Sequence, residues 1–215
     1  MDLDSRLVYS LKKYNANKKI REMLSSINPL LVKKETNIRV HLEALINRYI
    51  TQEEFKVIET KMKLGELCLD LENHIPDSFV TILFYCPEEN KIYHGAGPQF
   101  PVEFFDFFNE INKLNAFNSQ CGSCGSAVHQ RKVVITDILT DPLWGPFREH
   151  FIHHGFQTGW SIPFYRDQEV IGTFAIYHQF QKTVSKEEIQ LVQQKVSEYQ
   201  DAIYYMSERF LAKEA

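Results

Sequence analysis

Apolar residues recur at helical spacing through the first 75 positions of the chain. Two stripes occupy the first 50 residues, and Asn28-Pro29 separates them, because a residue before proline is pushed out of the helical region. The stripes comprise Leu3, Leu7, Leu11, Tyr14, Ile20, Leu24 and Ile27, and then Ile38, Leu42, Leu45 and Tyr49. Thr51 and Glu54 form a capping box that predicts the start of a further helix, which ends before Pro76.

The pattern changes after Pro76-Asp77, where short runs of β-branched and aromatic residues replace the helical stripes. Residues 79–85 form the clearest run and predict a buried strand, and the turn at 87–90 leads into a returning strand at 91–94. Further strands are predicted at 133–136, 158–165 and 170–178, and helices at 100–114, from Ser123 onward and at 143–154.

The most regular periodicity lies at the C-terminal end. Ser185 and Glu188 form a second capping box, and apolar residues then follow in alternating steps of three and four. They are Ile189, Val192, Val196, Tyr199, Ile203, Met206 and Phe210. This spacing fits a helix packed on the sheet of its own domain, and it fits equally well a helix that pairs with a neighbouring subunit.

Composition narrows the functional classes. The chain has 215 residues, a formal net charge of −4 and 13% aromatic residues, including 16 Phe, so a well-packed core or an aromatic pocket is expected. The sequence contains no block of lysine and arginine dense enough to follow a phosphate backbone, so nucleic acid is not an expected partner. The longest apolar run, residues 79–86, is too short to cross a bilayer, and the N-terminus has no signal-peptide pattern. We therefore expect a cytoplasmic protein without membrane contact, whose four cysteines are reduced.

Residues 122–178 combine strand-like runs with tight turns, backbone donors and both tryptophans, which is typical of a small-molecule pocket. The motifs are Gly122-Ser123-Cys124-Gly125, Asp141-Pro142-Leu143-Trp144, His154-Gly155, Trp160-Ser161-Ile162-Pro163 and Gly172-Thr173-Phe174-Ala175. In order and spacing they resemble the GAF-domain family, most closely its bacterial branch with a Gly-Ser-Cys-Gly motif. The resemblance continues more weakly back to about residue 55 and forward to the C-terminal helix.

The resemblance implies an α+β domain with the GAF fold over residues 55–215, with a central antiparallel sheet flanked by helices, preceded by a helical extension over residues 1–50. GAF domains are usually sensory modules that bind small ligands and regulate signalling proteins. One member type is a stand-alone cytosolic receptor for nitrate that controls a sensor kinase. Another is an enzyme that reduces free methionine sulfoxide.

Cys121 and Cys124 form a Cys-x-x-Cys pair with several alternative roles. They would serve as a redox switch, or as half of a zinc site with His150 and His154, although the gap to His150 is longer than zinc fingers use. The reductase resemblance requires a further cysteine between residues 137 and 161, and that segment contains none. In the simplest interpretation the flanking glycines set a tight turn and Cys124 is a small buried side chain.

The same turn suggests an anion site. If a short helix starts near Ser123, the free backbone donors of Ser123, Cys124, Gly125 and Ser126 converge, and a helix N-terminus holds anions without lysine or arginine. A small planar anion such as nitrate would suit this arrangement. The alternative is that Ser123 or Ser126 only caps the helix.

Aromatic residues complete the predicted ligand site. Trp144 and Trp160 would wall the pocket and offer their indole N–H groups to a ligand, although Trp144 would equally well seal its loop against the sheet. Tyr177 and Phe174 alternate along the last strand, so they face opposite sides of the sheet, and Tyr177 is assigned to the pocket.

Neither catalytic residues nor metal ligands are expected. His150 and His153 fit the surface of a helix, His154 fits a helix end, and no serine or cysteine nucleophile accompanies them. Asp137 and Asp141 fit turns better than a metal site.

The sequence therefore predicts a non-catalytic sensor without a cofactor. It would bind a nitrate-like anion through Ser123, Cys124, Gly125, Ser126, Trp144, Trp160 and Tyr177, control a sensor histidine kinase and form a homodimer through its terminal helices. The alternatives are a thiol-based redox sensor, a methionine sulfoxide reductase-like enzyme and a ligand-free interaction module.

Overall fold

The computed structural model describes residues 52–101 and 103–211. The chain divides into two compact units, residues 1–59 and 60–215, and the second holds all the described strands. The elements are α4 (Gln52–His74), β1 (Ser78–Cys86), β2 (Lys91–Ala96), α5 (Glu103–Lys113), α6 (Gly122–Gln130), β3 (Val134–Asp137), the 3-10 helix η1 (Pro142–Trp144), α7 (Arg148–His153), β4 (Thr158–Arg166), β5 (Glu169–His178), α8 (Lys186–Glu198) and α9 (Gln200–Leu211). The helical extension expected over residues 1–50 lies outside the described residues.

The five strands form one antiparallel sheet in the order β2-β1-β5-β4-β3. The β4–β5 hairpin turns through Asp167 and Gln168, whose φ angles of 48° and 69° lie in the left-handed region that suits the strand twist. β1 then inserts beside β5, so that Ser78 pairs with His178 and Phe84 with Gly172. The predicted α+β fold with a central antiparallel sheet flanked by helices is confirmed.

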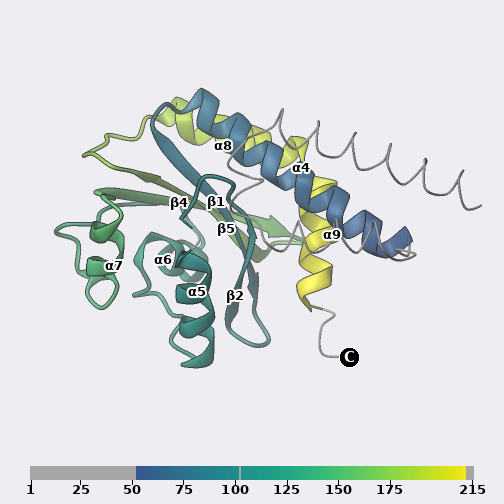
Figure 1. Ribbon diagram of the computed structural model, residues 1–215, viewed down its shortest axis with the longest axis horizontal. Helices are drawn as coiled ribbons and strands as arrows, with labels where there is room; N and C mark the ends of the chain where they lie inside the picture. Colours follow the sequence, from purple (N-terminus) through teal and green to yellow (C-terminus); the bar gives the residue numbers. More distant parts are fainter. Residues whose placement is uncertain (1–51, 102, 212–215) are drawn as a thin grey trace, which may run out of the picture. The chain divides into compact units, whose positions relative to one another are not determined.

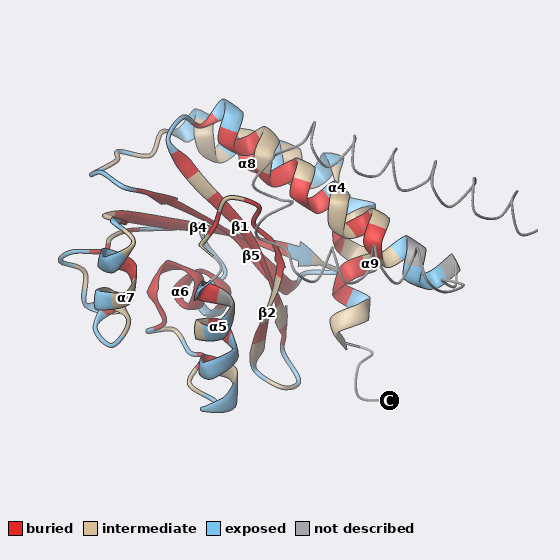
Figure 2. Ribbon diagram, in the orientation of Figure 1, coloured by how far each residue is buried: buried red, intermediate tan, exposed pale blue. Residues whose placement is uncertain are grey.

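Helices cover both faces of the sheet (Figure 1). α5, α6 and α7 lie over one face, while α8 and α9 lie over the other. Residues 60–74 of α4 lie on the same side of the sheet as α8. An ion pair of 2.9 Å between Asp70 of α4 and Lys195 of α8 joins the two helices. Because both faces are covered, β4 and β5 are buried along nearly their whole length (Figure 2).

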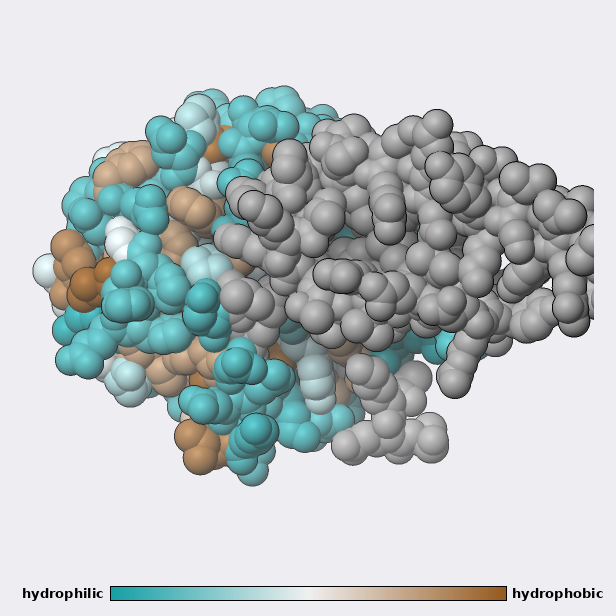
Figure 3. Space-filling model, in the orientation of Figure 1, coloured by the Kyte–Doolittle hydropathy of each residue, from teal (hydrophilic) through white to brown (hydrophobic). Residues whose placement is uncertain are grey.

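On the face shown in Figure 3, the described residues are mainly hydrophilic, with small separate hydrophobic patches. Among the described residues, no helix is both long and apolar enough to span a bilayer.

The alternation along β5 holds as predicted. Tyr177 packs into the cluster beneath α5 and α6, whereas Phe174 packs against Phe164 on the opposite face. On that face Phe84 contacts Phe164 of β4 and Phe210 of α9. The C-terminal apolar seam therefore packs on its own sheet over at least part of its length.

Two predicted helices are interrupted. The segment expected to be helical over 143–154 is split into η1 and α7, because Gly145-Pro146 cannot continue the helix. The Asp141 side chain caps η1 by accepting the backbone N–H of Leu143 at 3.0 Å. The C-terminal helix is split into α8 and α9 at Tyr199, while its predicted capping box is confirmed, with Ser185 and Glu188 each accepting the other's backbone N–H.

α6 requires glycine at two positions in its first turn. Gly122 has φ +59°, and a Cβ on it would lie 2.8 Å from the ring of Trp144. A Cβ on Gly125 would overlap the carbonyl oxygen of Asn118 and lie 2.7 Å from Cβ of Cys121. The helix can therefore begin against the Asn118–Cys121 turn only because these side chains are absent.

Glu72 is a buried acid at the junction of α4 and β1. Its side chain is 8% exposed, and its Oε1 accepts the backbone N–H of Val80 at 2.8 Å. Burial raises the pKa of Glu72 from 4.5 to about 7, although the hydrogen bond from the Val80 N–H lowers it in part.

Glu72→Gln should change the pH dependence of stability. The folded-state pKa lies above the unfolded value, so the unfolded chain releases its proton first and stability falls as the pH rises from 4.5 to about 7. The difference amounts to about 3 kcal/mol at neutral pH, which Gln would remove. Urea unfolding at several pH values measures it, and parallel pH profiles for the two proteins would contradict the prediction.

Gly125→Ala should destabilise the domain by about 1–3 kcal/mol, because the new methyl group displaces the Asn118–Cys121 turn. Gly65→Ala in α4 is the matched control, since its Cβ would lie 3.6 Å from Pro98 in ordinary contact. The control should gain about 0.4–1 kcal/mol. Equal unfolding midpoints for the two variants would rule out the tight approach described for Gly125.

Candidate ligand-binding cavity

An indole ring anchors the region between α6 and the sheet. Trp144 is 2% exposed, and its ring lies between Gly122 of α6 and Gly159 of β4, where an added Cβ would in each case approach the ring to 2.8 Å. Its Nε1–H donates to Oγ1 of Thr136 at 2.9 Å, and that hydroxyl donates to the carbonyl of Gly159 at 2.7 Å. Trp144 thus joins η1 to α6, β3 and β4.

Beside Trp144, four buried polar side chains pair with one another. Sγ of Cys124 lies 3.3 Å from the hydroxyl of Tyr177, and Oγ of Ser161 lies 2.9 Å from Oγ of Ser123 and 3.4 Å from Sγ of Cys124. These four side chains are between 0% and 6% exposed. The network satisfies polar groups that would be costly to bury alone.

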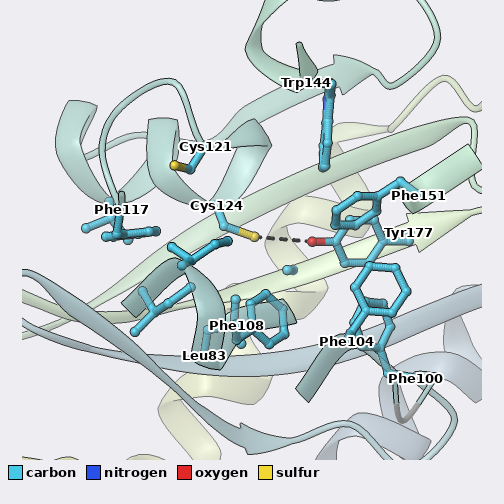
Figure 4. Packing of buried hydrophobic residues seen from close by; sticks show 14 of the residues in the cluster. Leu83, Phe100, Phe104, Phe108, Phe117, Cys121, Cys124, Trp144, Phe151 and Tyr177 are labelled. Atoms are coloured by element: carbon cyan, nitrogen blue, oxygen red, sulfur yellow. Dashed lines mark hydrogen bonds between the residues drawn. The ribbon is translucent and has the colours of Figure 1, made fainter. Parts of the chain in front are cut away.

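The network is uncharged at neutral pH. Burial raises the pKa of the Cys124 thiol, and it raises the pKa of Tyr177 well above its ordinary value, with Cys124 adding to the effect. Burial also raises the pKa of Cys121. All four cysteines are free and buried, and Figure 4 shows the sulfurs of Cys121 and Cys124 pointing in different directions. Neutral, buried thiols are poor nucleophiles.

A cavity of about 20 Å³ lies between Trp144 and Tyr177 on one side and α5 on the other (Figure 4). We call it the aromatic cavity. Its lining residues are Ile92, Phe107, Phe108, Ile111, Phe117, Cys121, Cys124, Trp144, Phe147, Phe151 and Tyr177. None of these described residues carries a charge, and the volume is close to that of one water molecule.

The structure brings together some of the predicted site residues. Cys124, Trp144 and Tyr177 line the aromatic cavity, while Ser123 lies behind Cys124 and contacts Ser161. The indole N–H predicted for ligand binding is already used by Thr136 in the case of Trp144. The cavity therefore forms at the predicted place, with a more apolar lining than the sequence suggested.

Gly125 and Ser126 use their polar groups within and beside α6. The backbone N–H of Gly125 donates to the Cys121 carbonyl at 3.0 Å, and Oγ of Ser126 accepts Nε2 of Gln130 at 2.6 Å. Fewer than the four expected backbone N–H groups are therefore free, because α6 begins at Gly122 rather than near Ser123.

Trp160 faces the opposite side of the sheet and donates its Nε1–H to Nε2 of His178 at 3.2 Å. Its assignment to the same pocket as Trp144 is wrong. Ser161, the next residue of β4, points to Cys124, and neighbouring residues of a strand point to opposite faces.

Sequence reasoning missed Ser161 and most aromatic walls of the cavity. Ser161, rather than Trp160, lies beside Cys124 because the β4–β5 register shifts by one residue between Phe164 and Tyr165, and alternation counted from the turn does not show this bulge. Phe107, Phe108 and Ile111 were visible as the apolar face of a helix, but that pattern does not show what the helix covers.

His150 is more buried than predicted, whereas His153 is exposed as predicted. His150 stacks on Phe107 with ring centroids 4.8 Å apart, and its Nε2 is buried without a hydrogen-bond partner. Burial lowers the pKa of His150, and the nearby His154 and His153 lower it further. Within residues 52–101 and 103–211, no group of three or more His, Cys, Asp or Glu side chains is arranged to hold a metal ion.

Comparisons with solved structures show the same fold. The GAF domain region of a putative membrane protein from Geobacter sulfurreducens has a TM-score of 0.53 and 12% identity, covering 72% of this chain and 99% of that one. A GAF domain/HD domain protein from the same organism has a TM-score of 0.52 and 14% identity, covering 73% and 98%. The photoproduct state of a GAF3 domain from Synechocystis gives 0.52 and 11%, covering 72% and 99%.

No curated protein matches the chain significantly. The sequence model of the GAF domain family, in contrast, matches residues 65–203, which span the whole sheet and the helices that build the aromatic cavity. This chain therefore belongs to the GAF domain family.

Proposed function

We propose that this protein is a sensory GAF module that binds a small molecule in the aromatic cavity and acts through binding rather than catalysis. The observation that carries the proposal is the small cavity beside Trp144, Cys124 and Tyr177, on the sheet face covered by α5 and α6. Ligand sensing is also the usual role of GAF domains.

The lining favours a small uncharged ligand with an apolar body. Aromatic rings and neutral thiols give no compensation for the hydration that an anion loses on entering. One feature favours a nitrate-like anion. The first N–H groups of α6, at Gly122, Ser123 and Cys124, have no acceptor within the helix. Both classes therefore belong in the first binding screen.

Binding requires the cavity to widen, since 20 Å³ does not hold an organic molecule. Phe107 and Phe147 are half-buried and lie on α5 and between η1 and α7, so they are the walls freest to move. We infer that a ligand shifts the equilibrium toward a widened state in which the segment 141–155 closes over it.

Hydrogen bonds connect α6 with the terminal helices. Beyond the end of α6, the carbonyl of Arg131 accepts the hydroxyl of Tyr165 at 2.8 Å, and the carbonyl of Tyr165 accepts the hydroxyl of Tyr204 of α9 at 3.2 Å. An ion pair of 2.6 Å between Arg166 and Glu208 lies alongside. We propose that a shift of α6 reaches α9 by this route and changes the interaction with a signalling partner such as a sensor histidine kinase, or with a second copy of the chain.

A second candidate is a ligand-free interaction module, which the small volume of the aromatic cavity favours. In that case the cavity is simply a tightly packed core, and output depends on the helices alone.

Phe107→Ala and Phe107→Trp should change ligand affinity in opposite directions, because one enlarges and the other fills the aromatic cavity. A thermal-shift panel of sodium nitrate, sodium chloride, phenol and toluene on the full chain measures this. We expect phenol or toluene to raise the Tm with concentration, more in Phe107→Ala and less in Phe107→Trp. No stabilisation by any compound in the three proteins would favour the interaction module.

Cys124→Ser should change ligand affinity by less than about threefold, because a hydroxyl can still pair with Tyr177 and Ser161. Mild peroxide treatment should likewise leave the affinity of the wild-type protein unchanged, since Cys121 and Cys124 are buried, neutral thiols. Loss of binding after peroxide in the wild type, but not in Cys124→Ser, would instead support a redox sensor. Turnover of free methionine sulfoxide would support the reductase.

A further inference from the structure

A second, larger pocket lies where β1 begins and β5 ends. Its volume is about 470 Å³, which is within the range of small-molecule sites. Its lining includes Glu72 of α4, Asp77, Ser78, Gln99 and Phe180. We call it the acidic pocket, and none of its lining residues belongs to the aromatic cavity.

Two buried polar atoms of this pocket have no hydrogen-bond partner. Oε2 of Glu72 and Oγ of Ser78 are both unpaired, and the two side chains are only 8% and 7% exposed. Oε1 of Glu72 is held by the N–H of Val80, which fixes the carboxyl group in place. Such unpaired buried groups are rare in folded proteins, and a water or another bound molecule can supply the missing partner.

The chemistry of the pocket favours a positively charged donor. Glu72 and Asp77 supply carboxylate oxygens and Ser78 supplies a hydroxyl oxygen, while no lysine or arginine belongs to its described lining. The rings of Phe79 and Phe180 add aromatic surface, which attracts organic cations and packs against their carbon atoms.

A bare metal ion fits less well. The pocket is far larger than an ion, and the described residues offer no group of three His, Cys, Asp or Glu side chains for coordination. Burial disfavours the ionised form of Glu72 and raises its pKa to about 7. A cation beside Oε2 would act in the opposite direction and favour the ionised carboxylate.

We propose that the acidic pocket binds the ammonium group of a small organic amine, with Oε2 of Glu72 and Oγ of Ser78 accepting its N–H groups. Phe79 and Phe180 would pack on the carbon skeleton, and Asp77 would add negative charge at the exposed side of the pocket. This site is additional to the proposed sensory cavity and does not depend on it.

The test uses three probes of the same shape and different charge on the full chain: benzylamine, benzyl alcohol and benzoate. Above the pKa of Glu72, titration calorimetry should show saturable benzylamine binding that is at least about tenfold tighter than benzyl alcohol, with no benzoate binding. Equal affinity for benzylamine and benzyl alcohol would overturn the proposal, because the carboxylate would then contribute nothing.

Variants assign the binding to this pocket. Glu72→Gln should weaken benzylamine binding at least about tenfold, and Ser78→Ala should weaken it by a smaller factor. Asp77→Asn offers a second charge removal with little risk to folding, because Asn tolerates the φ of +56° found at this position. Glu103→Gln on the exposed start of α5 is the matched control and should bind like the wild type.

The acidic pocket and the aromatic cavity are separable in the same experiment. Phe107→Trp should leave benzylamine affinity unchanged, since Phe107 lines only the aromatic cavity. Benzylamine binding that is lost in Phe107→Trp and kept in folded Glu72→Gln, Ser78→Ala and Asp77→Asn would place the amine in the aromatic cavity and overturn the proposal.

Discussion

The fit of Trp144 between two glycines determines the geometry of the ligand-binding face. A Cβ at Gly122 or at Gly159 would press into the indole ring, so the short 3-10 helix can seal the sheet only where α6 and β4 both lack side chains. The Nε1–H bond to Thr136 then fixes the ring in the plane between them. The position of the cavity, of Cys124 beneath it and of the segment that follows η1 all depend on this packing.

The same packing buries Cys121 and Cys124 of the conspicuous Cys-x-x-Cys motif. Once α6 is pressed against β4 and β5, Cys124 is directed toward Tyr177 and Ser161 in a dry region, where the thiolate is disfavoured. The glycines around the cysteines therefore serve the backbone, and the thiols serve as small polarizable packing groups. A sensor built this way would respond to shape and polarity more than to charge or oxidation.

Much of the fold followed from local signals, whereas the site followed only in part. The strands, the capping box at Ser185 and the turn at 87–90 are local features, and the sequence alone places them. Trp160 was misplaced because the register shift between Phe164 and Tyr165 reverses which side chains of β4 face Tyr177, and no sequence signal marked that bulge. The acidic pocket was invisible, since Glu72 and Ser78 meet residues near position 180 only after β1 pairs with β5.

The central claim is that the space between Trp144, Tyr177 and α5 is a ligand site rather than a well-packed core. The most direct measurement is a crystal structure of the full chain grown with the compound that gives the largest thermal shift. Our account predicts the compound in contact with Trp144 and Tyr177, with Phe107 moved outward and the Trp144–Thr136 hydrogen bond retained. A ligand bound elsewhere, with the aromatic cavity unchanged, would contradict it.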